Sequence, residues 1–167
     1  MRLPRLAVLA VLFIAALAGG WFATHRTTGS VGEAIDVYYA KPDGVTLVPW
    51  RVTLGPARDR KSAAFYAATQ CVAGPPPGTD ATRFPPGTRV LGASVEGSTV
   101  VVDLSRDVEA SAAGGFTESA EFRSLVWTLT QRALGFTAVR VLIGGRTVAT
   151  LPGGHLELDE PLSRSSF

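Results

Sequence analysis

The sequence has few of the residues that cross-link small proteins or bind metals. Among its 167 residues Cys71 is the only cysteine, so the chain can form no internal disulfide. The two histidines, His25 and His155, have no histidine or cysteine partner at the spacing of a zinc site. We therefore expect no bound metal, and a domain whose stability comes from a hydrophobic core alone.

Cys71 and His155 leave one enzymatic reading open, that of a thiol nucleophile with a histidine base. The other reading is structural. Cys71 lies on the apolar stripe of a predicted helix, where a cysteine behaves as a small core residue. We favour the core reading and expect His155 to be a solvated loop residue.

The globular part of the chain also lacks an excess of positive charge. The formal net charge is +2, but three of the sixteen basic residues (Arg2, Arg5 and Arg26) lie in the first 26 residues. From residue 31 onward, thirteen basic residues face fourteen acidic ones, a balance of −1. A near-neutral domain has no electrostatic footprint for nucleic acid, so we expect no nucleic-acid partner.

Residues 1–26 read as a membrane-directed segment. Arg2 and Arg5 precede seventeen uncharged residues, 6–22, and a basic start before an apolar run marks a signal peptide or a membrane anchor. In one reading the run stays in place as a single-pass helix, with Trp21 at the membrane interface. In the other it is cleaved after Ala18 and the protein is secreted. Both readings put the domain outside the cytoplasm, after a linker at 27–34.

The clearest local pattern is a β-hairpin between residues 90 and 104. Two β-branched runs, 90–95 and 99–104, flank a short segment that contains Gly97, which is a hairpin signal. Three consecutive valines, 100–102, leave no polar face in the second run. We therefore expect this strand to lie centrally in a sheet or to be covered on both sides.

Further strands and a helix precede this hairpin. Residues 35–39 and 45–54 read as strands joined by a turn, and Pro49 marks the second as an edge strand or a bulged one. Residues 59–73 read as a helix capped by Asp59 and ended by Gly74. The expected buried stripe of this helix is Ala64, Phe65, Ala68, Cys71 and Val72. A proline- and glycine-rich crossover, 74–87, leads into the hairpin.

After the hairpin a loop (106–115) leads to a second helix at 117–134. We expect Thr117 to cap it and expect a buried stripe of Phe122, Leu125, Val126, Leu129 and Ala133. A strand at 138–143, a glycine turn and a short return strand at 147–151 follow. In the tail, Leu156 and Leu158 are expected to anchor the chain to the core.

This order of elements predicts an α+β fold. Pairs of strands separated by helices favour one mixed, mostly antiparallel sheet with both helices packed on one face, preceded by one N-terminal hydrophobic helix.

One group of side chains could carry chemistry. Asp103, Asp107 and Glu109 form an acidic cluster after the central strand, and paired carboxylates can cleave glycosidic bonds. In the structural reading, Asp103 caps a turn and the other two are solvated. The cluster keeps open an alternative function, that of a cell-wall-acting hydrolase or glycan-binding domain.

Two tryptophans of the globular part are candidates for a contact surface. Trp50 lies beside Pro49 on the predicted edge strand, and tryptophan is over-represented among residues that dominate interfaces. Trp127 lies off the main stripe of the second helix and could form a second contact surface. The alternative for both is packing against the core.

Several short motifs, in their order and spacing, give the sequence its resemblance to a known family. They are Val37-Tyr38-Tyr39, Leu47-Val48-Pro49, Ala73-Gly74-Pro75, Pro86-Gly87-Thr88, Val90-Leu91-Gly92, the run 100–105, the helix segment 128–131, and 139–143 before Gly144-Gly145. Together they resemble the GerMN domain, the sporulation and spore germination module of bacterial envelope proteins. The resemblance covers residues 35–163 and leaves a tail at 164–167.

The resemblance implies a small module of the ring-building type, tethered to the outer face of the cytoplasmic membrane. It implies a non-enzymatic interaction and assembly role, with envelope proteins or other copies of the chain as partners and peptidoglycan nearby. It carries over no catalytic, cofactor-binding or metal-binding residue, so we expect none of these and no small-molecule cofactor.

Overall fold

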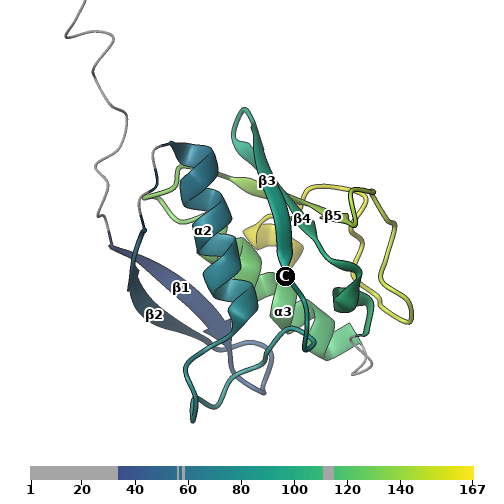
Figure 1. Ribbon diagram of the computed structural model, residues 1–167. Helices are drawn as coiled ribbons and strands as arrows, with labels where there is room; N and C mark the ends of the chain where they lie inside the picture. Colours follow the sequence, from purple (N-terminus) through teal and green to yellow (C-terminus); the bar gives the residue numbers. More distant parts are fainter. Residues whose placement is uncertain (1–33, 56, 58, 111–114) are drawn as a thin grey trace, which may run out of the picture. The chain divides into compact units, whose positions relative to one another are not determined.

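The computed structural model describes residues 34–55, 57, 59–110 and 115–167 (Figure 1). The predicted membrane segment, 1–26, and all but the last residue of the linker lie outside the described residues. Of the helices that the structure describes, none combines the length and the apolar character needed to cross a bilayer. The elements are β1 (Ala34–Ala40), β2 (Leu47–Thr53), α2 (Arg60–Ala73), β3 (Val90–Glu96), β4 (Thr99–Leu104), the 3-10 helix η1 (Arg106–Ala110), α3 (Gly115–Leu129), β5 (Ala138–Ile143) and the 3-10 helix η2 (Arg164–Ser166).

The α+β class is confirmed, but the single predicted sheet is two sheets. β1 and β2 form an antiparallel pair, and a second sheet has the order β3-β4-β5. Within it β4 is central, antiparallel to β3 and parallel to β5, so the strand pairs are mixed and mostly antiparallel as expected. The valine run 100–102 accordingly lies in a central strand, and all three side chains are buried.

Both helices share one core with one face of the three-stranded sheet. α2 packs against β3 and β4, α3 against β5, and the two helices contact each other. The sheet contributes alternate residues to this core, Val100, Val102 and Leu104 from β4 and Val139, Val141 and Ile143 from β5. Because side chains on a strand alternate between faces, these residues belong to the same face, as predicted for the helix layer.

Helix side chains explain why β1 and β2 remain a separate sheet. Three polar side chains on and just after α3 accept hydrogen bonds from alternate backbone N–H groups of β1. The pairs are Ala40 N to Ser124 Oγ (2.9 Å), Tyr38 N to Thr128 Oγ1 (2.9 Å) and Asp36 N to Gln131 Oε1 (3.2 Å). Two residues of a strand advance about 6.7 Å and three or four of a helix about 4.5–6 Å, so the two rows stay in step. The inner edge of β1 is thereby satisfied without a third strand.

The predicted bounds of α2 hold, but one member of its stripe does not. Asp59 forms a capping box with Ser62, and Gly74 ends the helix with a positive φ of 85°. Ala64, Ala68, Cys71 and Val72 are buried as expected, together with Ala63 and Ala67. Phe65 is 40% exposed, because the helix turns its alanine-rich face to the core. The prediction that Phe65 belongs to the buried stripe is therefore wrong.

α3 is shorter at its end than predicted and begins earlier. Phe122, Leu125, Val126 and Leu129 are fully buried as expected. Thr117 lies inside the helix, so it is not the N-cap. Ala133 lies in a turn beyond the helix and is exposed, and Leu134 fills the core in its place.

The predicted return strand at 147–151 is absent. Ile143 closes a tight turn with Arg146, and Leu162, much later in the chain, pairs with Val139 through two hydrogen bonds of 2.8 Å. The intervening loop folds back on itself through a bond from Leu158 N to Ala149 O. Leu158 is fully buried and Leu156 partly buried, which confirms both as anchors.

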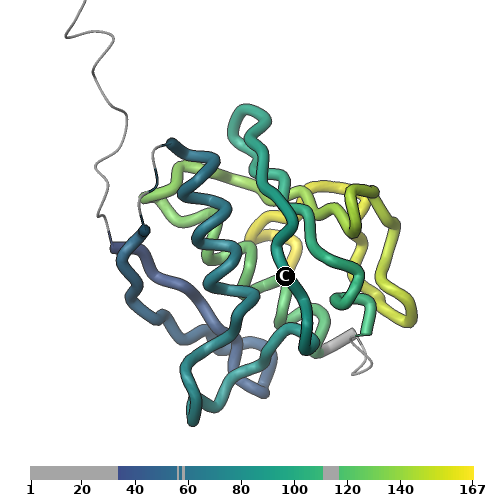
Figure 2. Tube along the Cα trace, viewed as in Figure 1, coloured from purple at the N-terminus to yellow at the C-terminus, as the bar shows by residue number. Residues whose placement is uncertain are grey.

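The crossover 74–87 has no regular structure, as predicted, and runs from the end of α2 to the start of β3 (Figure 2). Its Phe84 is buried and meets Phe122 of α3 edge to face, with ring centroids 5.9 Å apart. The backbone N–H of Thr82 donates to Ala40 O at the end of β1. This irregular segment is therefore fixed at two points.

Candidate interaction surface

β2 is the free edge of its sheet, and Pro49 lies on the outward side of it. Tyr38 pairs with Pro49, and the N–H of Tyr38 is directed to α3 and not to β2. The pair is therefore of the non-hydrogen-bonded kind, and the ring nitrogen of Pro49 faces away from β1. Because proline has no N–H, this edge offers one donor fewer to another strand. The prediction of an edge strand at Pro49 is confirmed.

Trp50 lies on this strand, at the border between core and solvent. It stands opposite Val37, which is fully buried, yet the tryptophan itself is 45% exposed. Its neighbours Pro49 and Arg51 are exposed as well, and Arg51 forms an ion pair with Asp36 at 3.1 Å. An exposed tryptophan on a strand that is paired along its length with the half-buried β1 is a rigid apolar surface.

Trp127 is covered by the end of the described chain. Its ring meets the Phe167 ring at a centroid distance of 6.1 Å. Two guanidinium groups lie over the indole, those of Arg123 at 5.7 Å and Arg164 at 5.4 Å from its centroid. Arg123 also donates to Phe167 O at 2.5 Å and to Gly44 O at 3.1 Å. The Trp127 face is thus packed within the domain and is the weaker candidate for a contact surface.

Two carboxylates of the predicted acidic cluster stabilise turns. Asp103 Oδ1 accepts from Gly145 N at 2.8 Å, which closes the turn after β5. Asp107 Oδ2 accepts from Ser105 Oγ at 2.8 Å, and that hydroxyl accepts from a backbone N–H at the start of β3. Glu109, the third member, lies in η1. The Asp103 contact agrees with the structural reading, in which this residue caps a turn; Asp107 is exposed, as that reading expects, but also accepts a hydrogen bond.

Cys71 is a core residue. It is 2% exposed, and its Sγ lies 3.9 Å from Tyr38 O. Burial raises the pKa of the Cys71 thiol to about 12, and that of Tyr39 is raised to about 12 mainly by burial too. A thiol that stays protonated is a poor nucleophile. His155 is exposed in the tail loop, while His25 and Trp21 lie outside the described residues.

Among the residues that the structure describes, no group of three or more histidine, cysteine, aspartate or glutamate side chains is arranged to hold a metal ion. Glu118, in the first turn of α3, is a buried carboxylate. It is 2% exposed, and its Oε2 accepts from His155 N at 2.9 Å. Within the part of the chain that the structure describes, its Oε1 has no hydrogen-bond partner.

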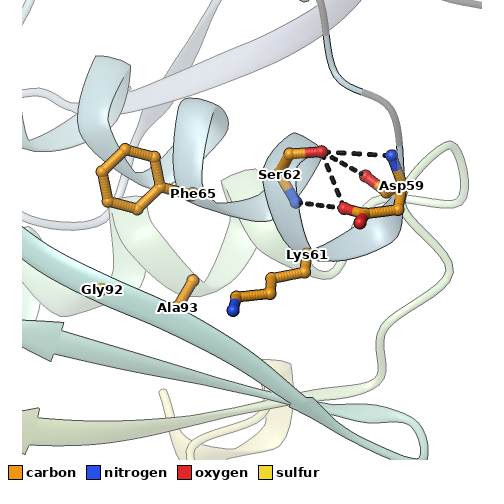
Figure 3. Close-up of a pocket in the computed structure, with 6 residues that line it drawn as sticks. All are labelled: Asp59, Lys61, Ser62, Phe65, Gly92 and Ala93. Carbon is orange, nitrogen blue, oxygen red and sulfur yellow. Dashed lines mark hydrogen bonds between the residues drawn. The ribbon is translucent and has the colours of Figure 1, made fainter.

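A groove between α2 and the edge strand β3 is the main feature that sequence reasoning missed. It has a volume of about 490 Å³ and is lined by Asp59, Lys61, Ser62, Phe65, Gly92 and Ala93. Figure 3 shows Phe65 above the strand at Gly92, and Lys61 extending from the helix toward the strand. The available signals were an aromatic residue in the predicted helix, which the sequence pattern had assigned to the buried stripe, and two small residues in a predicted strand. Neither signal by itself indicates that the two segments meet.

A family model and several solved structures relate this arrangement to known proteins. The model of the Germane family, described as "Sporulation and spore germination", matches residues 36–149. No curated protein sequence matches the chain.

Similar solved structures include the first GerMN domain of the sporulation protein GerM from Bacillus subtilis. It has 23% identity and a TM-score of 0.60 over 80% of this chain and 98% of that one. The tandem GerMN domains of the same protein match at 22% identity and a TM-score of 0.59, with 80% of this chain and 47% of that one covered. A "Putative Lipoprotein from Clostridium perfringens" matches at 14% identity and a TM-score of 0.59, covering 82% and 89%. At these identities the likeness shows a shared fold.

Proposed function

Since the chain belongs to the Germane family of sporulation and spore germination domains, we propose that it acts by contact, as a non-enzymatic interaction and assembly module of the bacterial cell envelope. Its partners are envelope proteins or further copies of the chain, close to peptidoglycan. The family match begins within β1 and extends past the end of β5, so it includes both α-helices and all the strands that the structure describes.

The exposed tryptophan on the β2 edge is the observation that carries this proposal. Trp50 is 45% exposed, although it stands on a strand whose partner residue is fully buried. A large aromatic ring presented on a rigid strand gains contact area at low entropic cost, and such residues dominate many interfaces. The buried thiol of Cys71 and the turn-closing role of Asp103 point in the same direction, because both are engaged structurally.

The proposed location is the outer side of the cytoplasmic membrane, with residues 1–26 as a single-pass anchor. The support is the uncharged run 6–22 behind Arg2 and Arg5, which favours a cytoplasmic N-terminus. The fold shared with a "Putative Lipoprotein" agrees with an envelope location. An anchor also raises the local concentration in the membrane plane, so a weak contact is sufficient for assembly. Fractionation should find the full-length protein in the carbonate-resistant membrane pellet. A soluble mature chain beginning at Gly19 would instead support cleavage after Ala18.

Replacing Trp50 tests the contact itself. We expect Trp50→Ala to leave circular dichroism and melting temperature close to those of the wild type and to weaken crosslinking of the full-length protein in membranes. Val45→Ala is the matched control, because Val45 is also apolar and 66% exposed but lies in the β1–β2 turn. Unfolding of the Trp50 variant would assign Trp50 to the core. Unchanged crosslinking in a folded variant would rule out the β2 edge as the contact.

A further inference from the structure

The groove between α2 and β3 adjoins unpaired strand backbone. The β3–β4 hairpin turns through Gly97, at a φ of 61°, with Glu96 paired to Thr99. In a two-residue hairpin loop the closing pair is hydrogen-bonded, and the bonded pairs alternate from there. Val95 and Ala93 therefore direct their N–H and C=O groups away from β4. Within the described part of the chain, no other group bonds to them.

The side chains around this edge leave space for one more strand. Gly92 has no heavy atom within 4 Å of where a Cβ would stand, and Ala93 is small. Phe65 supplies an apolar wall from α2 and is 40% exposed. A strand added at Ala93 and Val95 would direct every second side chain toward α2, because residues opposite each other share a face.

Lys61 and Asp59 are the charged side chains that line the groove, and the cationic end of Lys61 is the one that extends toward β3 (Figure 3). The carboxylate of Asp59 is occupied by the capping box, where it accepts from Ser62 N and Ser62 Oγ, both at 2.7 Å. Lys61 forms no ion pair with any residue that the structure describes. The side chain of Glu96, at the end of β3, lies on the opposite face of the sheet from Ala93 and Val95, so it does not face α2.

We propose that this groove binds an extended, acidic peptide segment of a partner protein, which adds a strand to β3. Its backbone pairs with Ala93 and Val95. One side chain directed toward α2 is apolar and contacts Phe65, and the next one in that direction is a carboxylate that pairs with Lys61. Strand addition of this kind takes its affinity from main-chain bonds and its specificity from alternate side chains. This groove does not include Trp50, so the proposed peptide binding can be tested independently of the proposed contact at β2.

The probe is a fluorescein-labelled peptide, Thr-Val-Thr-Glu-Thr-Val-Thr, with Thr-Val-Thr-Lys-Thr-Val-Thr as its matched control. We expect the glutamate peptide to bind the full-length protein at least about tenfold more tightly than the lysine peptide, measured by fluorescence anisotropy. Lys61→Glu should reverse that order, whereas Arg146→Glu, the same change at an exposed position on the turn after β5, should leave it unchanged. Hydrogen exchange should slow at the amides of Ala93 and Val95 when the glutamate peptide is bound.

Backbone pairing is tested separately with Ala93→Pro, which removes an outward N–H and no bond to β4. We expect this variant to lose peptide binding and to keep its fold. If the Ala93→Pro variant unfolds, the same test uses the wild-type protein with a glutamate peptide N-methylated at alternate residues. The methylated peptide cannot donate backbone hydrogen bonds to β3, so we expect it not to bind. No saturable binding up to about 1 mM, or equal binding of both peptides, overturns the proposal. A dimer of the protein alone that Lys61→Glu dissociates also overturns it, because the occupant is then a second copy.

Discussion

Replacing Thr128 by valine tests the helix-to-strand contacts that define the fold. Thr128 is fully buried on α3, and its Oγ1 accepts the hydrogen bond from Tyr38 N of β1 at 2.9 Å. Valine has nearly the same shape and no acceptor. The substitution therefore leaves the volume of the core unchanged and leaves the Tyr38 N–H without a partner at the inner edge of β1.

A backbone donor left without a partner costs about 1–3 kcal/mol of the free energy of unfolding. For a domain of this size that corresponds to a fall in melting temperature of about 3–10 °C. Thermal melting followed by circular dichroism measures the difference. Amide hydrogen exchange should at the same time become faster at Tyr38, because its protecting acceptor is gone.

Thr69→Val on α2 is the matched control. Among the described residues, the Thr69 hydroxyl donates to Phe65 O of its own helix, at 2.7 Å, and accepts from no backbone N–H. We expect this variant to melt close to the wild type. If Thr128→Val melts no lower than Thr69→Val, the hydrogen bonds from β1 to the polar side chains of α3 do not stabilise β1. The division into two sheets must then have another cause.

Three further predictions concern the core, the tail loop and the buried thiol. Leu129→Ala, at a fully buried position of α3, should cost about 2–5 kcal/mol of unfolding free energy in a denaturant titration, and a loss no larger than that of the exposed Arg132→Ala would contradict the assigned helix face. Gly154→Ala should destabilise the domain by about 1–3 kcal/mol, because the added Cβ would lie 2.7 Å from Cδ of the buried Glu118. Its control is Gly92→Ala, which should melt like the wild type because a Cβ there meets nothing within 4 Å. Equal melting temperatures of the two variants would refute the close approach of Gly154 to Glu118. The pKa of Cys71 is raised by burial from 9.0 to about 12, so between pH 9 and 12 the unfolded chain loses a proton that the folded chain keeps, and stability should fall as pH rises through that window. Cys71→Ala should flatten this fall in denaturant titrations, and an unchanged slope would show that the thiol does not contribute to it.

The local elements were largely predictable from the sequence, since their signals lie within a few residues. Asp59 and the pair Gly74-Pro75 marked both ends of α2 correctly, because capping and chain termination act over one turn. Gly97 marked the β3–β4 turn, and Pro49 the edge strand. The strand at 147–151 was mispredicted because Leu162, from much later in the chain, pairs with Val139 in place of a local return strand.

The candidate surfaces were predictable only in part. Trp50 was identified as a contact candidate by residue type and by its place beside Pro49, and the structure adds how far it is exposed. The α2–β3 groove joins Lys61 and Phe65 to Gly92 and Ala93, about thirty residues later in the chain, and no local pattern indicates that these segments meet.

By itself the sequence determined the secondary-structure types, the main core residues of α3 and the family resemblance, because capping, turn chemistry and hydrophobic periodicity are local properties of the chain. The tertiary structure alone decided that the strands divide into two sheets. Ser124, Thr128 and Gln131 look like ordinary polar helix residues until β1 is placed beside them. The backbone N–H groups that they bind are the same in every residue but proline, so only the folded arrangement selects which ones they meet.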